Sequence, residues 1–224
     1  MIRKLFVGAA ASALFGLLAW SLYHLPAHPA GLTVQAHAAL PRSGVSHPVT
    51  AVLLNYRGYD TLLEIAVLLL AVVGVWSLRA MPAGGPEARG APILGALLRL
   101  IVPSLLLVGG YMLWIGAFAP GGAFQGGALL GGALVLLLLG GLGGALLRHI
   151  GLLRAALSAG LLVFIAVGAL SMAVTGTLLQ YPEGLAGTLI LVIESAAMVS
   201  IGLTLGAMFH GGRPVRAEGA GDDE

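Results

Sequence analysis

Six long apolar stretches alternate with shorter polar connections along the chain. They cover residues 5–25, 61–78, 93–118, 128–147, 152–174 and 187–209. Each is close to the roughly 20 residues that an α-helix needs to cross about 30 Å of hydrocarbon. The connections are rich in proline and glycine, which end helices, most clearly at residues 81–92. The pattern predicts an all-α integral membrane protein with about six transmembrane helices.

The composition agrees with a chain that lies in lipid. Hydrophobic residues make up 58% of it and charged residues 9%, whereas a soluble domain has about 25% charged residues. The mean hydropathy is +1.00. Glycine accounts for 35 of the 224 residues without the three-residue period of collagen. In a membrane protein this excess predicts helices that pack closely through small residues.

Charge and residue usage exclude several classes of function. The net charge is +2, but the basic residues stand singly or in pairs between apolar runs, so nucleic-acid binding is not expected. Because the chain has no cysteine, disulfides, thiolate metal sites and iron–sulfur ligation are excluded. His24, His28, His37 and His47 lie in or beside one connection, and their spacing matches no metal-ligand pattern. We expect no metal there, and rather a loop that contacts a partner.

The basic residues predict the orientation in the membrane, because cytoplasmic connections carry an excess of Lys and Arg. On one side of the six predicted spans only Arg42 and Arg57 are found. The other side has nine basic residues: Arg3, Lys4, Arg79, Arg89, Arg99, Arg148, Arg154, Arg213 and Arg216. Both termini are therefore predicted to be cytoplasmic.

The first span has an alternative interpretation as a secretory signal. Basic residues precede its apolar run, and an Ala-x-Ala sequence follows at residues 36–38. The apolar run of residues 5–25 is longer than the 7–15 residues typical of a signal peptide, and the Ala-x-Ala lies well beyond its end. We favour a retained membrane span.

Two acidic residues lie within predicted spans. Charged groups in hydrocarbon cost several kcal/mol unless they are sheltered, so each is a functional candidate. Glu64 lies one turn into the second span and Glu194 about two turns into the sixth. Both spans run from outside to inside in the predicted topology, so both carboxyls should lie roughly 5–10 Å below the outer surface. They are candidates for one water-filled half-channel or cation site. The alternative is that each caps a helix end or bonds a neighbouring helix.

Arg57 and Asp60 precede Glu64 at positions i, i+3 and i+7, which share one helix face. Gly58 interrupts this helix pattern. One interpretation is a short helix that turns back, or a helix broken at Gly58, which at membrane depth must be shielded by other protein. The other is an ion pair at a helix start, with Asp60 as the N-cap before Thr61. Both are kept open, and all three charged residues are ion-path candidates.

A glycine-rich connection precedes the fourth span. The spacings Gly122/Gly126 and Gly127/Gly131 are those that let helix backbones touch. A phosphate-binding loop is excluded because the segment has no Lys-Ser/Thr, no preceding strand and no basic residue. We expect Gln125 to bond an exposed backbone group. The predicted helix-packing motif comprises Pro120, Gly121, Gly122, Phe124, Gln125, Gly126, Gly127 and Gly131.

Two stretches resemble subunits of known complexes. Residues 49–64, with the run Arg-Gly-Tyr-Asp-Thr, resemble the C-terminal region of the large A subunit of Mrp-type multisubunit sodium/proton antiporters. A small subunit of energy-converting membrane-bound hydrogenases has the same region. Residues 119–127, with Gly-Gly-x-Phe-Gln-Gly-Gly, resemble the antiporter B subunit. The resemblance covers about residues 45–79 and 95–209, most of the chain.

The resemblance implies a natural fusion. Residues 1–92 would form a two-span A-tail module, residues 93–210 a four-span B module, and residues 211–224 a disordered cytoplasmic tail. It further implies a subunit that is not an enzyme and has no cofactor, in a complex that moves sodium ions or protons across a bacterial or archaeal inner membrane. In the family, the acid matching Glu64 is associated with ion translocation. The family usually has Asp where Asn55 stands, Ser where Ala119 stands and Gly where Ala123 stands. The missing acid at Asn55 argues against sodium handling rather than against proton handling.

Three other functions compete with an ion-path subunit that packs against larger antiporter subunits. The first is the equivalent subunit of a redox-driven, hydrogenase-related complex. The second is a structural spacer that moves no ion. A stand-alone transporter is the weakest alternative. The chain has no obvious inverted repeat, and its single lysine leaves little for a complete proton relay.

Overall fold

The computed structural model describes residues 2–25, 31–78, 92–142, 150–182 and 184–211. Within these ranges the secondary structure is helical and contains no strand. The chain divides into two compact units, Met1–Gln35 and Ala36–Glu224. The predicted tail, residues 211–224, falls outside the described residues except for Gly211, which ends the last helix.

The first unit consists mainly of α1 (Ile2–Tyr23), which is long and apolar enough to cross a membrane. None of the residues Lys4–Tyr23 is buried. At its C-terminal end the rings of Trp20 and His24 lie 4.0 Å apart, and those of Tyr23 and His24 lie 5.3 Å apart. Aromatic residues at a helix end are typical of the membrane–water interface. The short helix α2 (Thr33–Ala39) and the 3₁₀ turn η1 (Leu40–Arg42) follow.

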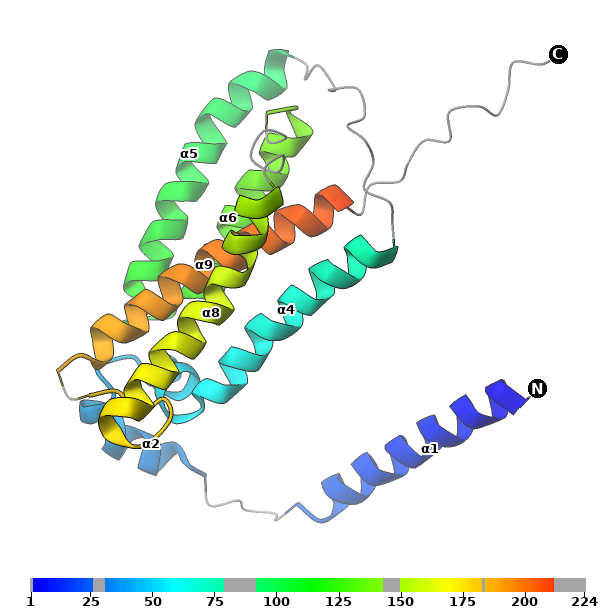
Figure 1. The fold of residues 1–224 in the computed structure, drawn as a ribbon, viewed down its shortest axis with the longest axis vertical. Coiled ribbons are helices and arrows are strands. Elements are labelled where there is room, and N and C mark those ends of the chain that lie inside the picture. Colours follow the sequence, from blue (N-terminus) through cyan, green and yellow to red (C-terminus); the bar gives the residue numbers. More distant parts are fainter. Residues whose placement is uncertain (1, 26–30, 79–91, 143–149, 183, 212–224) are drawn as a thin grey trace. The chain divides into compact units, whose positions relative to one another are not determined.

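The described part of the second unit contains five long helices (Figure 1). These are α4 (Gly58–Leu78), α5 (Pro92–Ile115), α6 (Ala123–Leu139), α8 (Ile150–Thr175) and α9 (Ala186–Gly211). Helix α9 is the most buried, and it packs against α4, α5, α6 and α8. It therefore forms the centre of this unit.

The predicted fold class is confirmed. Five described helices, α1, α4, α5, α8 and α9, are long and apolar enough to span a membrane, and α6 is a shorter apolar helix. Its 17 residues correspond to about 26 Å at 1.5 Å per residue. The protein is an all-α, multi-pass membrane protein.

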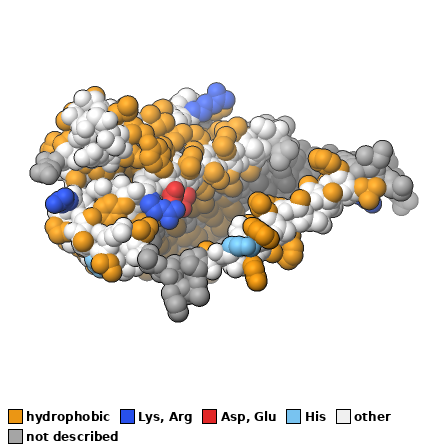
Figure 2. Space-filling model, turned by 90° about the horizontal axis from the view of Figure 1, so that it is seen from below, with side chains coloured by type: hydrophobic (Ala, Val, Ile, Leu, Met, Phe, Trp, Pro, Cys, Tyr) orange, Lys and Arg blue, Asp and Glu red, His pale blue; other side chains and the backbone are white. Residues whose placement is uncertain are grey.

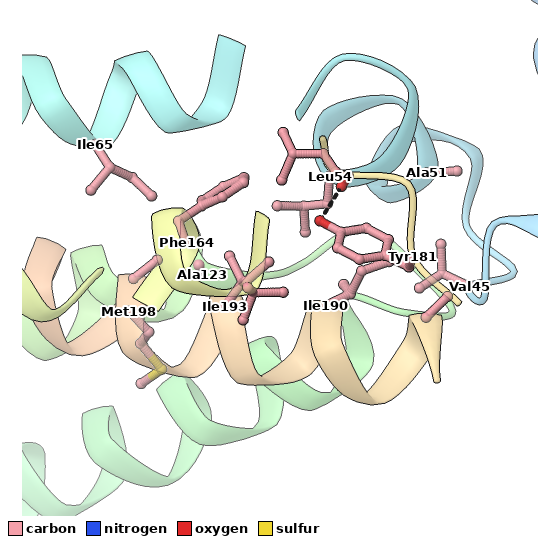
Figure 3. Packing of buried hydrophobic residues seen from close by; sticks show 14 of the residues in the cluster. Val45, Ala51, Leu54, Ile65, Ala123, Phe164, Tyr181, Ile190, Ile193 and Met198 are labelled. Atoms are coloured by element: carbon pink, nitrogen blue, oxygen red, sulfur yellow. Dashed lines mark hydrogen bonds between the residues drawn. The ribbon is translucent and has the colours of Figure 1, made fainter. Parts of the chain in front are cut away.

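The largest hydrophobic cluster joins segments that are distant in the chain (Figure 3). Leu54 and Ile65 meet Phe164 of α8 and Ile190 and Ile193 of α9, and all five side chains are buried. Residues from both sides of the predicted module boundary at 92/93 thus share one core. This core fixes the start of α4 against α8 and α9.

Helix α6 corrects the predicted fourth span. It starts at Ala123 rather than residue 128, so the second half of the expected connection is helical. It ends at Leu139 rather than residue 147, because Gly141 takes the left-handed conformation with φ +77°. The Leu142 N–H then donates to the Leu137 carbonyl at 2.9 Å and the Gly141 N–H to the Leu138 carbonyl at 3.3 Å. These two bonds form a Schellman cap. Residues 143–147 fall outside the described residues.

Candidate functional site

A broken helix leads into α4. Helix α3 (Pro48–Ala51) continues as a π-helical turn, η2 (Val52–Tyr56), and the backbone leaves helical geometry at Arg57, where φ is −127° and ψ is 35°. Helix α4 then begins at Gly58. The helix is therefore interrupted, as the first interpretation of this segment predicted, but the break falls at Arg57 and Gly58 begins the next helix.

The ion pair of the second interpretation is present as well. Arg57 and Asp60 form a salt bridge, with side chains that are 66% and 46% exposed. Asp60 lies in the first turn of α4 and is not the N-cap, which corrects that part of the prediction. On the face shown in Figure 2, the visible acidic side chains lie beside a basic one, and hydrophobic side chains cover much of the surrounding described surface.

Side chains bond the carbonyl groups that the break leaves free. The Thr61 hydroxyl donates to the Leu53 carbonyl at 2.7 Å. The Tyr181 hydroxyl, from the connection between α8 and α9, donates to the Leu54 carbonyl at 2.8 Å (Figure 3). Burial raises the pKa of Tyr181 above its ordinary value, so the hydroxyl remains a donor. These bonds matter because a buried carbonyl left unpaired costs about 1–3 kcal/mol.

The broken helix is also attached to the C-terminal end of α5. The backbone N–H groups of Ser46 and His47 donate to the Ala117 carbonyl at 2.9 and 3.0 Å. The Thr50 hydroxyl donates to the Gly116 carbonyl at 2.5 Å. Residues 46–50 are thus fixed beside the glycine-rich connection that leads into α6.

Glu194 lies at the N-terminus of α6, although it belongs to α9. Its side chain is 6% exposed, and its Oε1 accepts a hydrogen bond from the Ala123 N–H at 3.3 Å. Ala123 is the first residue of α6. A carboxylate is favoured there because the helix dipole and the unpaired N–H groups attract negative charge. This geometry corresponds to the helix-capping alternative for Glu194.

Glu64 and Glu194 line the same cavity, which has a volume of about 450 Å³. It lies where the broken helix, the start of α4, the start of α6 and α9 meet. The structure also places Gln125 there, with an exposed side chain. Three further polar residues on its wall were not predicted: His47, Thr50 and Thr61. No local sequence pattern indicates them, because they reach the cavity only through contacts made by the folded chain.

A second, wider groove of about 790 Å³ adjoins Glu64 on the flank of α4. Asp60 and Glu64 are its acidic residues, and the remaining lining is apolar. Phe124 of α6 lines both the groove and the cavity. Arg57 lines neither. The structure therefore brings three of the four ion-path candidates to these two openings.

The glycines of the predicted motif lie where helix backbones approach each other. A Cβ at Gly126 would be 2.9 Å from the Gly109 carbonyl oxygen of α5. One at Gly127 would be 2.8 Å from the Ile201 side chain of α9, and one at Gly131 would be 2.9 Å from Leu205 Cβ.

The connection before α6 is equally tight. A Cβ at Gly121 would be 2.6 Å from the Met112 carbonyl oxygen. Pro120 lines the cavity next to it.

Among the described residues, no group of three or more His, Asp or Glu side chains is arranged to hold a metal ion.

The sequence matches a family model described as a domain related to the MnhB subunit of Na⁺/H⁺ antiporters, over residues 93–213. The chain belongs to this MnhB-related family. The match begins at residue 93, where the four-span module was predicted to start. Comparison with curated proteins gave no match.

Two solved structures have the fold of this MnhB-related chain. One is a chain of the membrane-bound sulfane sulfur reductase, an archaeal respiratory membrane complex. It is 24% identical, with a TM-score of 0.68, over 94% of this chain and 98% of that chain. The other is the Mrp complex from a Dietzia species, 22% identical with a TM-score of 0.64. That match covers 97% of this chain and 27% of the longer Dietzia chain. The predicted resemblance to Mrp-type antiporter subunits is confirmed.

Proposed function

We propose that the protein is a membrane subunit of a multisubunit cation/proton antiporter, in which it forms part of the ion path and packs against larger antiporter subunits. The observation that carries the proposal is the cavity shared by Glu64 and Glu194. Membership of the MnhB-related family supports it. We further propose that the chain is not an enzyme, that sodium ions or protons pass beside it, and that it works in a bacterial or archaeal cell membrane.

The geometry of Glu194 suits a group that exchanges a cation or a proton. One carboxylate oxygen, Oε1, is held by the α6 N-terminus. In the part of the chain that the structure describes, the other oxygen accepts no hydrogen bond, and the residue lines the cavity. The anchored oxygen keeps the side chain in place while the second oxygen is available to a cation. An ion path needs such sites to bind strongly enough for entry and weakly enough for release.

The same residues would serve a redox-driven complex, the second candidate. The likeness to a chain of an archaeal respiratory complex over 98% of that chain favours it. In that case the redox chemistry lies in partner subunits, and this chain again contributes an ion path. Purifying the native complex and identifying its subunits distinguishes the two candidates, since only the second includes redox subunits.

The test of an ion path is to replace each acid by glutamine. Glu64→Gln or Glu194→Gln keeps the shape and much of the hydrogen bonding but removes the titratable charge. We expect each variant to assemble into the complex and to lose most ion exchange in membrane vesicles, measured as proton movement after a sodium pulse. Aspartate at either position should have a milder effect.

A matched control is Ser195→Ala, next to Glu194. The Ser195 side chain is half-buried, and within the described residues it bonds only inside its own helix, to the Leu191 carbonyl at 2.7 Å. This variant should transport normally. If both glutamine variants also transport normally, the chain is a structural spacer.

A further inference from the structure

The groove beside Glu64 is open to the side of the helix bundle. On one side it is lined by α4 residues from Asp60 to Leu68, and on the other by Phe124 and Ala128 of α6. Ile201 and Leu205 of α9, which contacts both helices, contribute the remaining wall. Apart from Asp60 and Glu64 the lining is apolar. The groove therefore faces the hydrocarbon layer unless another molecule covers it.

Glu64 is exposed on this flank. It is the seventh residue of α4, about 9 Å from the helix start at 1.5 Å per residue. It lies inside the candidate span Gly58–Ser77. Within the described ranges its carboxylate forms no salt bridge and no hydrogen bond. A carboxylate at this position would face lipid, which costs several kcal/mol.

The basic residues of this chain that the structure describes do not neutralise Glu64. Arg57 is already paired with Asp60. The start of α4 is attached to the C-terminal end of α5 through Thr50 and Gly116. Arg99 lies 17 residues before Gly116, about 26 Å from it along α5, and the structure shows no salt bridge between Arg99 and Glu64. His47 lines the neighbouring cavity and not the groove.

We propose that a transmembrane helix of a partner subunit occupies this groove and places a basic side chain (Lys, Arg or His) beside Glu64. The argument is charge complementarity: an apolar channel with one unpaired acid at membrane depth fits an apolar helix with one cation at the same depth. A lipid tail fills the apolar part but cannot neutralise the acid. The inference deepens the proposed function, because the partner helix would form the missing wall of the ion path at Glu64.

Site-specific photo-crosslinking in the intact complex from native membranes tests this inference. A photoreactive residue replaces Val67 or Leu205, both exposed in the groove. The control position is Leu107, on the exposed side of α5 away from the groove. We expect the two groove positions to crosslink to one membrane helix of another subunit, with a basic residue within one turn of the linked residue. Position 107 should not label that helix.

Several outcomes would overturn the inference. These are crosslinks from the groove to lipid only, to this chain's own helix Ile2–Tyr23, to a second copy of this chain, or to a partner helix without a basic residue near the link. Glu64→Lys adds a second test, because two cations repel. The Glu64→Lys variant should strongly reduce the crosslink from position 67, and replacing the partner's basic residue by Glu in that variant should restore the crosslink.

The readout separates this inference from the proposed function. If Glu64→Gln abolishes transport but the groove crosslinks only to lipid, the ion path stands and the partner helix is wrong. If Glu64→Gln transports normally but the groove crosslinks to a helix with a basic residue, the partner helix stands and Glu64 has a role in assembly alone.

Discussion

The carboxylate of Glu194 lies directly against the backbone of Gly122, at the point where α6 begins. A Cβ at position 122 would be 2.6 Å from Glu194 Oε1. Gly122 has φ +114° and ψ −168°, a region of backbone space that is essentially restricted to glycine. The glycine thus provides both the turn that starts α6 and the space for the buried acid.

Gly122→Ala should therefore displace Glu194. The added methyl group collides with Oε1, and the backbone is strained by about 1–3 kcal/mol at this conformation. We expect a lower thermal unfolding midpoint of the purified complex and reduced ion exchange. Gly132→Ala is the control, because a Cβ there has no atom within 4 Å outside its own helix. A Gly122→Ala complex with wild-type stability and transport would show that this contact is not needed.

A pair of neighbouring glycines tests the packing of α6. Gly131→Leu should prevent assembly, because even a Cβ there would be 2.9 Å from Leu205 Cβ and 3.3 Å from the Gly202 carbonyl oxygen. Gly132→Leu is the control: it changes the next residue of the same helix, where a Cβ would have no atom within 4 Å outside its own helix. Copurification of the other subunits with each tagged variant measures assembly. Wild-type recovery of subunits with Gly131→Leu would contradict close packing between α6 and α9.

The bond from Tyr181 to the broken helix is a third target. Tyr181→Phe removes the donor to the Leu54 carbonyl and leaves it unpaired in a buried site, which should cost about 1–3 kcal/mol. Tyr59→Phe is the control, because Tyr59 is exposed. Thermal unfolding and amide exchange around residues 52–58 measure the effect. Equal stability of the two variants would show that water or another group replaces the hydroxyl.

The same bond has a defined pH dependence. Because burial raises the pKa of Tyr181, its contribution to stability is fully present below the ordinary tyrosine pKa of about 10 and is lost as the pH rises above that value. The stability difference between the wild type and Tyr181→Phe should therefore be constant near neutral pH. It should shrink only in strongly alkaline solution.

Local patterns predicted the helices and the two acids, and long-range contacts account for what they missed. Glu64 and Glu194 stand out because a charge in an apolar run is visible in the sequence. That Glu194 would bond Ala123, 71 residues earlier in the chain, is not visible. The same holds for Tyr181 and Leu54, which are 127 residues apart. The early start of α6 was missed because glycines usually end helices, whereas Gly126 and Gly127 here are held in one by close contacts with α5 and α9.

The last prediction concerns the orientation in the membrane. Three connections of the second unit lie at the same end of the bundle, since Ser46 and His47 bond Ala117 and Tyr181 bonds Leu54. Reporter fusions at Gly122 and at Glu183 should therefore always report the same side. From the distribution of basic residues we expect that side to be the outside, and fusions near Gly84 and Gly221 to report the cytoplasm. If residues 82–86 were found outside, the predicted orientation would be reversed. If the sites at 122 and 183 were found on opposite sides, the number of spans between them would be wrong.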